Sequence, residues 1–132
     1  MISGDRPETP VATMRANGVS GLSPEIMGLG PIEAVRKALG YAKMSVSDID
    51  LFEINEAFAV QVLGSARELG IDEDKLNVSG GAIALGHPFG MTGARITATL
   101  LNNLAAHDKT FGVETMCVGG GQGMAMIVER LS

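Results

Sequence analysis

Cysteine and histidine are scarce in this sequence, and their scarcity limits the chemistry available to it. The chain has one cysteine, Cys117, and two histidines, His87 and His107, among 132 residues. A single cysteine cannot form an internal disulfide, and this set falls short of the four ligands of a structural zinc site. We therefore expect no metal ion and a protein of a reducing compartment.

Long apolar runs and clusters of positive charge are also absent. The longest uninterrupted apolar run, at 124–128, has five residues, whereas a membrane-spanning helix needs about 20. Residues 1–10 lack the apolar stretch of a signal peptide, and residues 129–132 are not a peroxisomal address. The net charge is −5 and the basic residues are scattered, so we expect no basic patch that could bind nucleic acid. These features predict a soluble, cytoplasmic protein without membrane or nucleic-acid partners.

Glycine, by contrast, is abundant and gathers in three clusters. Its 18 residues are about twice the usual share. Glycine collects where the backbone takes positive φ angles or approaches another group closely, so we expect loops to carry the function. The clusters comprise Gly28 and Gly30; Gly80, Gly81, Gly86, Gly90 and Gly93; and Gly119, Gly120, Gly121 and Gly123.

The hydrophobic pattern alternates between strand-like and helix-like segments. Strands are predicted at 11–16, 51–54, 76–78, 110–117 and 123–131, and helices at 31–43, 57–69 and 91–107. The order β-α-β-α-β-α-β-β predicts an α/β domain whose mixed five-stranded sheet carries helices on both faces, with the last strand antiparallel. We assign residues 10–132 to this domain and residues 1–9 to an N-terminal tail or truncated inter-domain linker.

The helix expected at 91–107 has almost no charged residues. Between Thr92 and Ala106 only Arg95 is charged. A helix without a charged face is usually covered on more than one side, and this chain offers it no second neighbour. The pattern predicts a surface that is buried against a partner.

Three side chains follow three different predicted strands. Asn55 comes directly after 51–54, His87 lies in the loop after 76–78, and Cys117 ends the strand 110–117. Ligands of parallel α/β sheets bind beyond the carboxyl ends of the strands. The topology therefore predicts that an amide, an imidazole and a thiol meet at one edge of the sheet.

Each of these residues also has a structural interpretation. Cys117 can be a small buried apolar residue, and His87 a hydrogen-bonded loop residue. Asn55 and Glu56 can be a helix N-cap and its first-turn acid. His107, near a helix end, is assigned no role.

The sequence motifs at these positions resemble one family. Residues 55–59 read NEAFA, residues 80–95 read GGAIALGHPFGMTGAR, and residues 117–123 read CVGGGQG. In this order they resemble the three C-terminal signatures of the thiolases, the acetyl-CoA acyltransferases, and residues 23–31 (SPEIMGLGP) are similar to the stretch ahead of the family's first C-terminal helix. The resemblance implies one of the two similar βαβαβαββ halves of a thiolase, its C-terminal domain.

The resemblance also implies roles for individual residues. His87 resembles the histidine that deprotonates the nucleophilic cysteine and then holds the thioester oxygen. Asn55 resembles the asparagine that orients a water, completing that oxyanion hole. Cys117 resembles the second cysteine, a general acid and base whose pKa we expect a nearby imidazolium to lower. The backbone N–H of Gly119 is similar to the donor of the other oxyanion hole.

Two further positions, Met27 and Phe58, match residues that touch the pantetheine arm of coenzyme A. Coenzyme A thioester is thus implied as the substrate, with no other cofactor. Thr92 stands where the family usually has serine, and this replacement keeps the hydroxyl group.

The resemblance leaves one catalytic group unaccounted for. The family's first half supplies the acylated cysteine, and this chain's only cysteine occupies the acid/base position. We therefore expect the C-terminal catalytic half of an acetyl-CoA C-acyltransferase, inactive without an N-terminal half, whose partners are acyl-CoA and that half or further copies in a homo-oligomer. The alternatives are a non-catalytic domain that binds acyl-CoA or a partner protein, and a self-sufficient hydrolase that uses Cys117 and His87.

Overall fold

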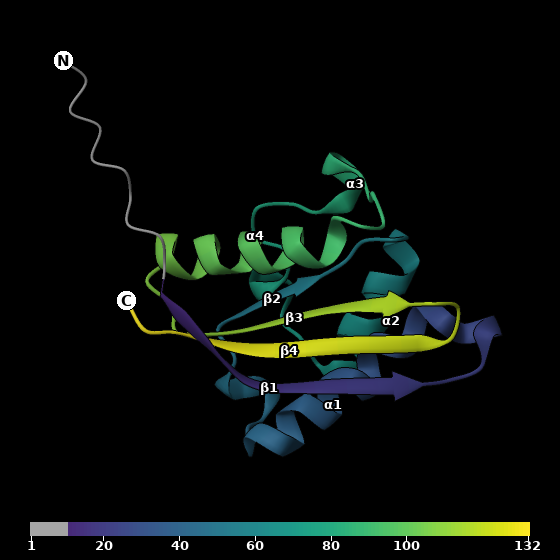
Figure 1. The fold of residues 1–132 in the computed structure, drawn as a ribbon, viewed down its shortest axis with the longest axis horizontal. Coiled ribbons are helices and arrows are strands. Elements are labelled where there is room, and N and C mark those ends of the chain that lie inside the picture. Colours follow the sequence, from purple (N-terminus) through teal and green to yellow (C-terminus); the bar gives the residue numbers. More distant parts are fainter. Residues whose placement is uncertain (1–10) are drawn as a thin grey trace.

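The computed structural model describes residues 11–132, which form one mixed β-sheet with helices on both faces (Figure 1). The predicted α/β fold class is confirmed. The tail assigned to residues 1–9 lies outside the described residues. The strands are β1 (Ala12–Gly21), β2 (Leu51–Ile54), β3 (Phe111–Val118) and β4 (Gln122–Arg130). The helices are α1 (Gly30–Ala42), α2 (Ala59–Leu69), α3 (Ala82–Leu85) and α4 (Thr92–Ala106), with short 3-10 turns at Pro24–Leu29, Val46–Asp48 and Glu73–Lys75.

The sheet has four strands in the order β1-β4-β3-β2. β2 and β3 are parallel, and β4 runs antiparallel to both β3 and β1. The predicted hairpin of the last two strands is confirmed, because β3 and β4 pair from Phe111 opposite Glu129 to Val118 opposite Gln122. The parallel pair places the carboxyl ends of β2 and β3 at one edge.

The prediction of a five-stranded sheet was wrong, because residues 76–78 do not form a strand. Leu76 makes a single parallel bridge to Phe52. The next residue, Asn77, takes a φ of 46°. Its side chain makes hydrogen bonds to β2 that the backbone of a fifth strand would otherwise make. Its Oδ1 accepts from the N–H of Ile54 at 2.8 Å, and its Nδ2 donates to the carbonyl of Ile54 at 3.0 Å.

Other element boundaries differ by smaller amounts. β1 continues to Gly21, beyond the predicted end at residue 16, and a 3-10 turn follows it before α1. The loop predicted after residue 78, which carries His87, contains the single turn of α3. The helix predicted from residue 57 begins at Ala59.

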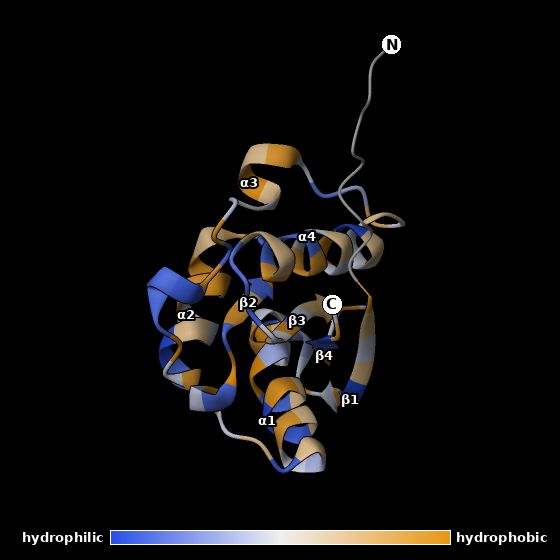
Figure 2. Cartoon of the chain, turned by 90° about the vertical axis from the view of Figure 1, so that its left-hand side faces the viewer, coloured by the Kyte–Doolittle hydropathy of each residue, from blue (hydrophilic) through white to orange (hydrophobic). Residues whose placement is uncertain are grey.

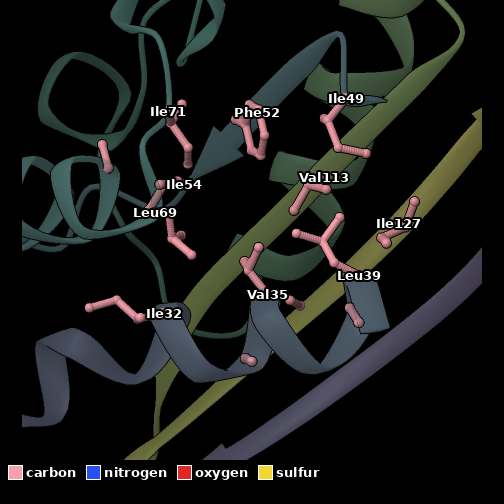
Figure 3. Packing of buried hydrophobic residues seen from close by; sticks show 14 of the residues in the cluster. Ile32, Val35, Leu39, Ile49, Phe52, Ile54, Leu69, Ile71, Val113 and Ile127 are labelled. Atoms are coloured by element: carbon pink, nitrogen blue, oxygen red, sulfur yellow. The ribbon is translucent and has the colours of Figure 1, made fainter. Parts of the chain in front are cut away.

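The main hydrophobic core lies between the sheet and helices α1 and α2. Figure 3 shows Val35 and Leu39 of α1 directed at Val113 of β3 and Ile127 of β4. These residues follow the helical spacing seen in the sequence, which puts them on one face of α1. A smaller cluster on the opposite face packs α4 on the sheet through Leu51, Leu100, Leu104 and Val128. Among the residues described, no helix is both long and apolar enough to cross a membrane.

The helices cover the two faces of the sheet unequally. Figure 2, an end-on view, shows α4 on one side of the sheet and α1 on the other. α4 packs mainly on β2 and β3. On its side of the sheet, Met14, Val19 and Met124 are 55%, 51% and 44% exposed. The outward residues of α4, Ala94, Ala98, Asn102 and Ala105, are uncharged. This uncharged helix face and the neighbouring apolar sheet face correspond to the partner-covered surface that we predicted from the composition of α4.

Candidate active site

One pocket at the carboxyl end of β3 brings together five of the six predicted site residues. Its volume is about 470 Å³. The five are His87, Cys117, Gly119, Met27 and Phe58, and the rest of the lining is Ala57, Phe89, Met116 and Val118. Segments far apart in the sequence therefore converge on this edge of the sheet.

The sixth residue, Asn55, lies beneath the pocket and contacts His87. Its side chain is fully buried, and its backbone N–H donates to the carbonyl of Thr115 at 2.9 Å, which extends the β2–β3 ladder by one step. The amide Nδ2 lies 3.5 Å from Nδ1 and 3.4 Å from Nε2 of the His87 ring. Such long, near-equal distances describe a weak contact rather than a directed hydrogen bond. Asn55, His87 and Cys117 thus lie at one edge, as their strand positions predict.

The closest partner of His87 is Thr92, in the first turn of α4. Nδ1 of His87 lies 2.5 Å from the Thr92 hydroxyl, which lies 3.2 Å from the carbonyl oxygen of Pro88. A hydroxyl has one proton, and a carbonyl can only accept. We assign the hydroxyl proton to the bond with Pro88, the carbonyl four residues back in the chain, so the Thr92 hydroxyl accepts from Nδ1–H. This arrangement leaves Nε2 of His87 without a proton, which suits a general base.

A buried ion pair lies on the far side of Asn55 from His87. Arg95 of α4 donates from Nη2 to Oδ1 of Asn55 at 3.3 Å, and its Nη1 lies 3.5 Å from Oε1 of Glu53. Burial raises the pKa of Glu53 to about 7, against the opposing attraction of the Arg95 guanidinium. We assigned neither residue a role from the sequence. The signals were a single charge in an otherwise uncharged helix and a carboxylate inside an apolar strand.

The acid of the NEAFA motif, Glu56, fastens the loop that carries His87. Its carboxylate accepts from Nδ2 of Asn77 at 2.8 Å and from the N–H of Ile83 at 2.9 Å. The capping interpretation of Asn55 and Glu56 was wrong, because α2 begins at Ala59 with Phe58 as its N-cap and no side-chain cap bond. Glu56 instead holds the segment leading to His87 against the end of β2.

Cys117 lies near the end of β3, ahead of a tight turn of three glycines. Burial raises the pKa of its thiol above the ordinary value, because an apolar pocket disfavours the thiolate. This is the opposite of the lowering that we expected from an imidazolium. The turn itself requires glycine, since Gly119 and Gly120 have φ angles of 59° and 72°. Cys117 is thus held as a neutral thiol that can give a proton.

The outer part of the pocket is aromatic and exposed. Phe58 and Phe89 are 70% and 89% exposed, and the ring of Phe89 lies edge-on to His87 at 5.2 Å between centroids. Nothing in the sequence had singled out Phe89. Exposed aromatic rings beside a pocket are typical of sites whose apolar lining binds part of an extended ligand.

Comparison with known proteins identifies the family. The family model described as "Thiolase, C-terminal domain" matches residues 8–130. The acetyl-CoA acetyltransferase of Escherichia coli is 53% identical over 124 residues, which are 94% of this chain and 32% of the relative. The 3-ketoacyl-CoA thiolase of Bacillus subtilis is 52% identical over 120 residues, or 91% of this chain and 31% of the relative.

Solved structures give the same result. Human mitochondrial 3-ketoacyl-CoA thiolase superimposes with a TM-score of 0.91 at 48% identity, over 94% of this chain and 32% of that protein. Its complex with CoA superimposes with a TM-score of 0.90. The chain therefore spans about a third of the length of these relatives. Within that third, the sequence and the fold agree in assigning the chain to the thiolase family, as a C-terminal domain.

Proposed function

We propose that this chain is the C-terminal catalytic half of an acetyl-CoA C-acyltransferase of the cytoplasm. The reaction is thiolytic cleavage of 3-ketoacyl-CoA, or the reverse Claisen condensation of acetyl-CoA. The supporting observation is the convergence of His87, Cys117 and Gly119 on one pocket, with Asn55 buried against the imidazole. The domain acts with an N-terminal thiolase half that provides the nucleophilic cysteine.

The chemistry of the proposed reaction explains the residue types at this site. In thiolysis, a cysteine sulfur of the N-terminal half bonds to the 3-keto carbon, and the bond between C2 and C3 breaks. The electron pair of that bond becomes the enolate of acetyl-CoA, and the thiol of Cys117 gives its proton to C2. The resulting thiolate then takes the proton of the incoming coenzyme A thiol, and the coenzyme A sulfur bonds to the acyl carbon. The bond between that carbon and the nucleophilic cysteine sulfur breaks, the acyl group leaves as a new coenzyme A thioester, and the cysteine regains its proton from His87.

Negative charge develops on an oxygen atom at two stages, and hydrogen-bond donors stabilise it. His87 and a water oriented by Asn55 donate to the enolate oxygen, and the N–H of Gly119 donates to the oxygen of the tetrahedral adduct. One such donor typically lowers the barrier by about 3–4 kcal/mol. The unprotonated Nε2 of His87 first takes the proton of the nucleophilic cysteine and thereby becomes a donor itself. The raised pKa of Cys117 keeps its thiol protonated until the enolate forms.

The substrate arm lies along the exposed side of the pocket. Met27 and Phe58 line it and provide apolar surface for the pantetheine of coenzyme A. The exposed ring of Phe89 adds to this surface. The relative solved with CoA supports coenzyme A as the ligand, and no further cofactor is needed.

The partner half covers the open side of α4. That surface includes the exposed side chains of Met14, Val19 and Met124 beside an uncharged helix face. Apolar area of this kind is typical of protein interfaces. Matches to only about a third of each relative further support a second half, on the same chain or on a separate one.

Reconstitution tests the proposal. This chain is co-expressed with the N-terminal part of the E. coli acetyl-CoA acetyltransferase, and the complex is assayed for coenzyme A-dependent cleavage of acetoacetyl-CoA. We expect co-elution, turnover by the complex and none by this chain alone. His87→Asn abolishes turnover, and His107→Asn, at the exposed end of α4, is the matched control that keeps it.

The possible outcomes distinguish the alternatives. A folded complex with no turnover contradicts the proposal. Calorimetric binding of coenzyme A by that inactive complex supports the non-catalytic acyl-CoA-binding domain instead. Turnover by this chain alone supports the self-sufficient hydrolase.

A further inference from the structure

We propose that Arg95, paired with Glu53, is the positioning residue that fixes the amide of Asn55 with its nitrogen toward His87. This inference rests on the proposed function, in which Asn55 supplies a donor. It concerns two residues outside the pocket lining, neither of which touches the substrate.

The three side chains form one buried row across the contact between β2 and α4. Glu53 and Asn55 are two residues apart in extended backbone, so both point to the α4 face of the sheet. The side chains of Glu53 and Arg95 are only 1% and 10% exposed, and Asn55 is fully buried. Arg95 reaches this row from the first turns of α4, 40 residues further along the chain.

The chemistry of the guanidinium decides which way the amide faces. An arginine side chain has five N–H donors and no acceptor, so the amide atom next to it must be the oxygen. That atom is Oδ1, at 3.3 Å from Nη2. The amide nitrogen of Asn55 then points the other way, toward the ring of His87 at 3.4 Å. In the flipped orientation, two N–H groups would face Arg95 and the carbonyl oxygen would face His87.

Orientation matters because only one end of the amide helps the reaction. A nitrogen directed at the site donates to a water or to an oxyanion, whereas an oxygen there repels negative charge. The contact of Asn55 with His87 is long and poorly directed, so it cannot hold the amide by itself. Arg95 provides the fixed contact on the other side.

Stability alone does not account for the pair. A buried ion pair loses hydration, and apolar residues of similar volume often serve the fold equally well. Glu53 attracts the guanidinium as its counter-charge, with Oε1 3.5 Å from Nη1. The pair therefore acts through Asn55, as a group that supports a catalytic residue.

The test uses the reconstituted complex and a double-mutant cycle. Arg95→Met removes the donors but keeps a long side chain, and we expect kcat to fall about 10- to 100-fold, since one oxyanion donor typically contributes a factor of 10² to 10³. KM for acetoacetyl-CoA should change by less than about threefold. In an Asn55→Ala background, Arg95→Met should cost less than about twofold more, because no amide remains to be oriented.

Two variants provide controls. Arg95→Lys keeps a cationic donor and should recover part of kcat. Arg67→Met removes an exposed arginine of α2 and should leave kcat unchanged. An equal loss from Arg95→Met in both backgrounds overturns the inference, since a purely structural effect does not depend on Asn55. Unchanged kcat in Arg95→Met overturns it as well.

A second measurement needs no turnover and separates this inference from the proposed function. The side-chain amide signals of Asn55, identified by their absence in Asn55→Asp, are followed by ¹⁵N NMR in this chain. We expect slow hydrogen exchange in the parent and at least about tenfold faster exchange in Arg95→Met, or in Arg95→Leu should the methionine variant not fold. Equal exchange rates overturn the inference even where the complex is active. Faster exchange in an inactive complex supports it while the proposed function fails.

Discussion

The Nδ1 atom of His87 lies 2.5 Å from the hydroxyl oxygen of Thr92, which itself donates to the carbonyl of Pro88 at 3.2 Å. Thr92 is 1% exposed and opens α4, so a rigid helix orients the imidazole. The hydroxyl is the part of threonine that this arrangement uses, so we expect serine to replace threonine at this position.

The first prediction concerns this hydroxyl. Thr92→Val has nearly the same shape but accepts no hydrogen bond, so the imidazole loses its orientation and its tautomer. In the reconstituted enzyme we expect kcat to fall about tenfold or more, a fraction of what a general base contributes. Thr92→Ser should stay within about threefold of the parent. Equal rates for the valine and serine variants would contradict the assignment.

The second prediction concerns Glu114, a buried carboxylate on the α4 face of β3. Burial raises its pKa to about 7 from an ordinary value of 4.5. The folded state therefore holds a proton that the unfolded state has lost between these two pH values. The stabilisation is fully present below about pH 4.5 and is lost as the pH rises through about 7.

Replacing this carboxyl by an amide removes the contribution of Glu114 to the pH dependence of stability. Glu114→Gln should be more stable than the parent by about 2–3 kcal/mol at pH 8 and nearly equal at pH 4.5. Urea unfolding at several pH values measures the difference. Glu73→Gln, at an exposed position, is the control and should track the parent. A Glu114→Gln difference that is constant with pH would refute the explanation.

The third prediction concerns the close approach of Gly81 to Glu56. A Cβ at Gly81 would lie 2.4 Å from the carboxyl carbon of Glu56, so Gly81→Ala must displace the carboxylate from Asn77 and Ile83. We expect a loss of about 1–3 kcal/mol in unfolding free energy and reduced turnover, because the loop carrying His87 is released. Gly40→Ala, in open space within α1, should instead stabilise by about 0.5–1 kcal/mol. Thermal denaturation of both variants provides the comparison.

The fourth prediction concerns the reactivity of Cys117. Because burial raises the pKa of its thiol, the thiolate population at neutral pH is small. Alkylation by iodoacetamide should reach half its maximal rate at a higher pH than alkylation of glutathione. Mass spectrometry after exposure of this chain to acetyl-CoA should show no acetyl adduct. A rapid 1:1 adduct would identify Cys117 as a nucleophile and contradict its role as acid and base.

The long helices and the four strands of the sheet were predictable because each has a local signal. Ile32, Val35 and Leu39 repeat at helical spacing, and all three are buried in α1. The convergence of Asn55 and Cys117 was also predictable, because Asn55 follows and Cys117 nearly ends one of two parallel strands that finish at the same edge. His87 reaches this edge although 76–78 is not a strand, since Leu76 still makes a parallel bridge to Phe52. The segment 76–78 misled the prediction, because its apolar residues are typical of a strand and the side chain of Asn77 satisfies the backbone of Ile54 instead.

The sequence by itself determined the family, the alternation of helices and strands, and which residue types reach the reactive edge, because motifs and periodicity are local properties of the chain. Only the tertiary structure decided how those groups are held. The guanidinium of Arg95 against Asn55, Glu56 beneath Gly81 and the burial that holds Cys117 as a thiol all depend on side chains that are distant in sequence. Such contacts follow from how α4 and the glycine loop pack against β2 and β3, and no local pattern specifies that packing.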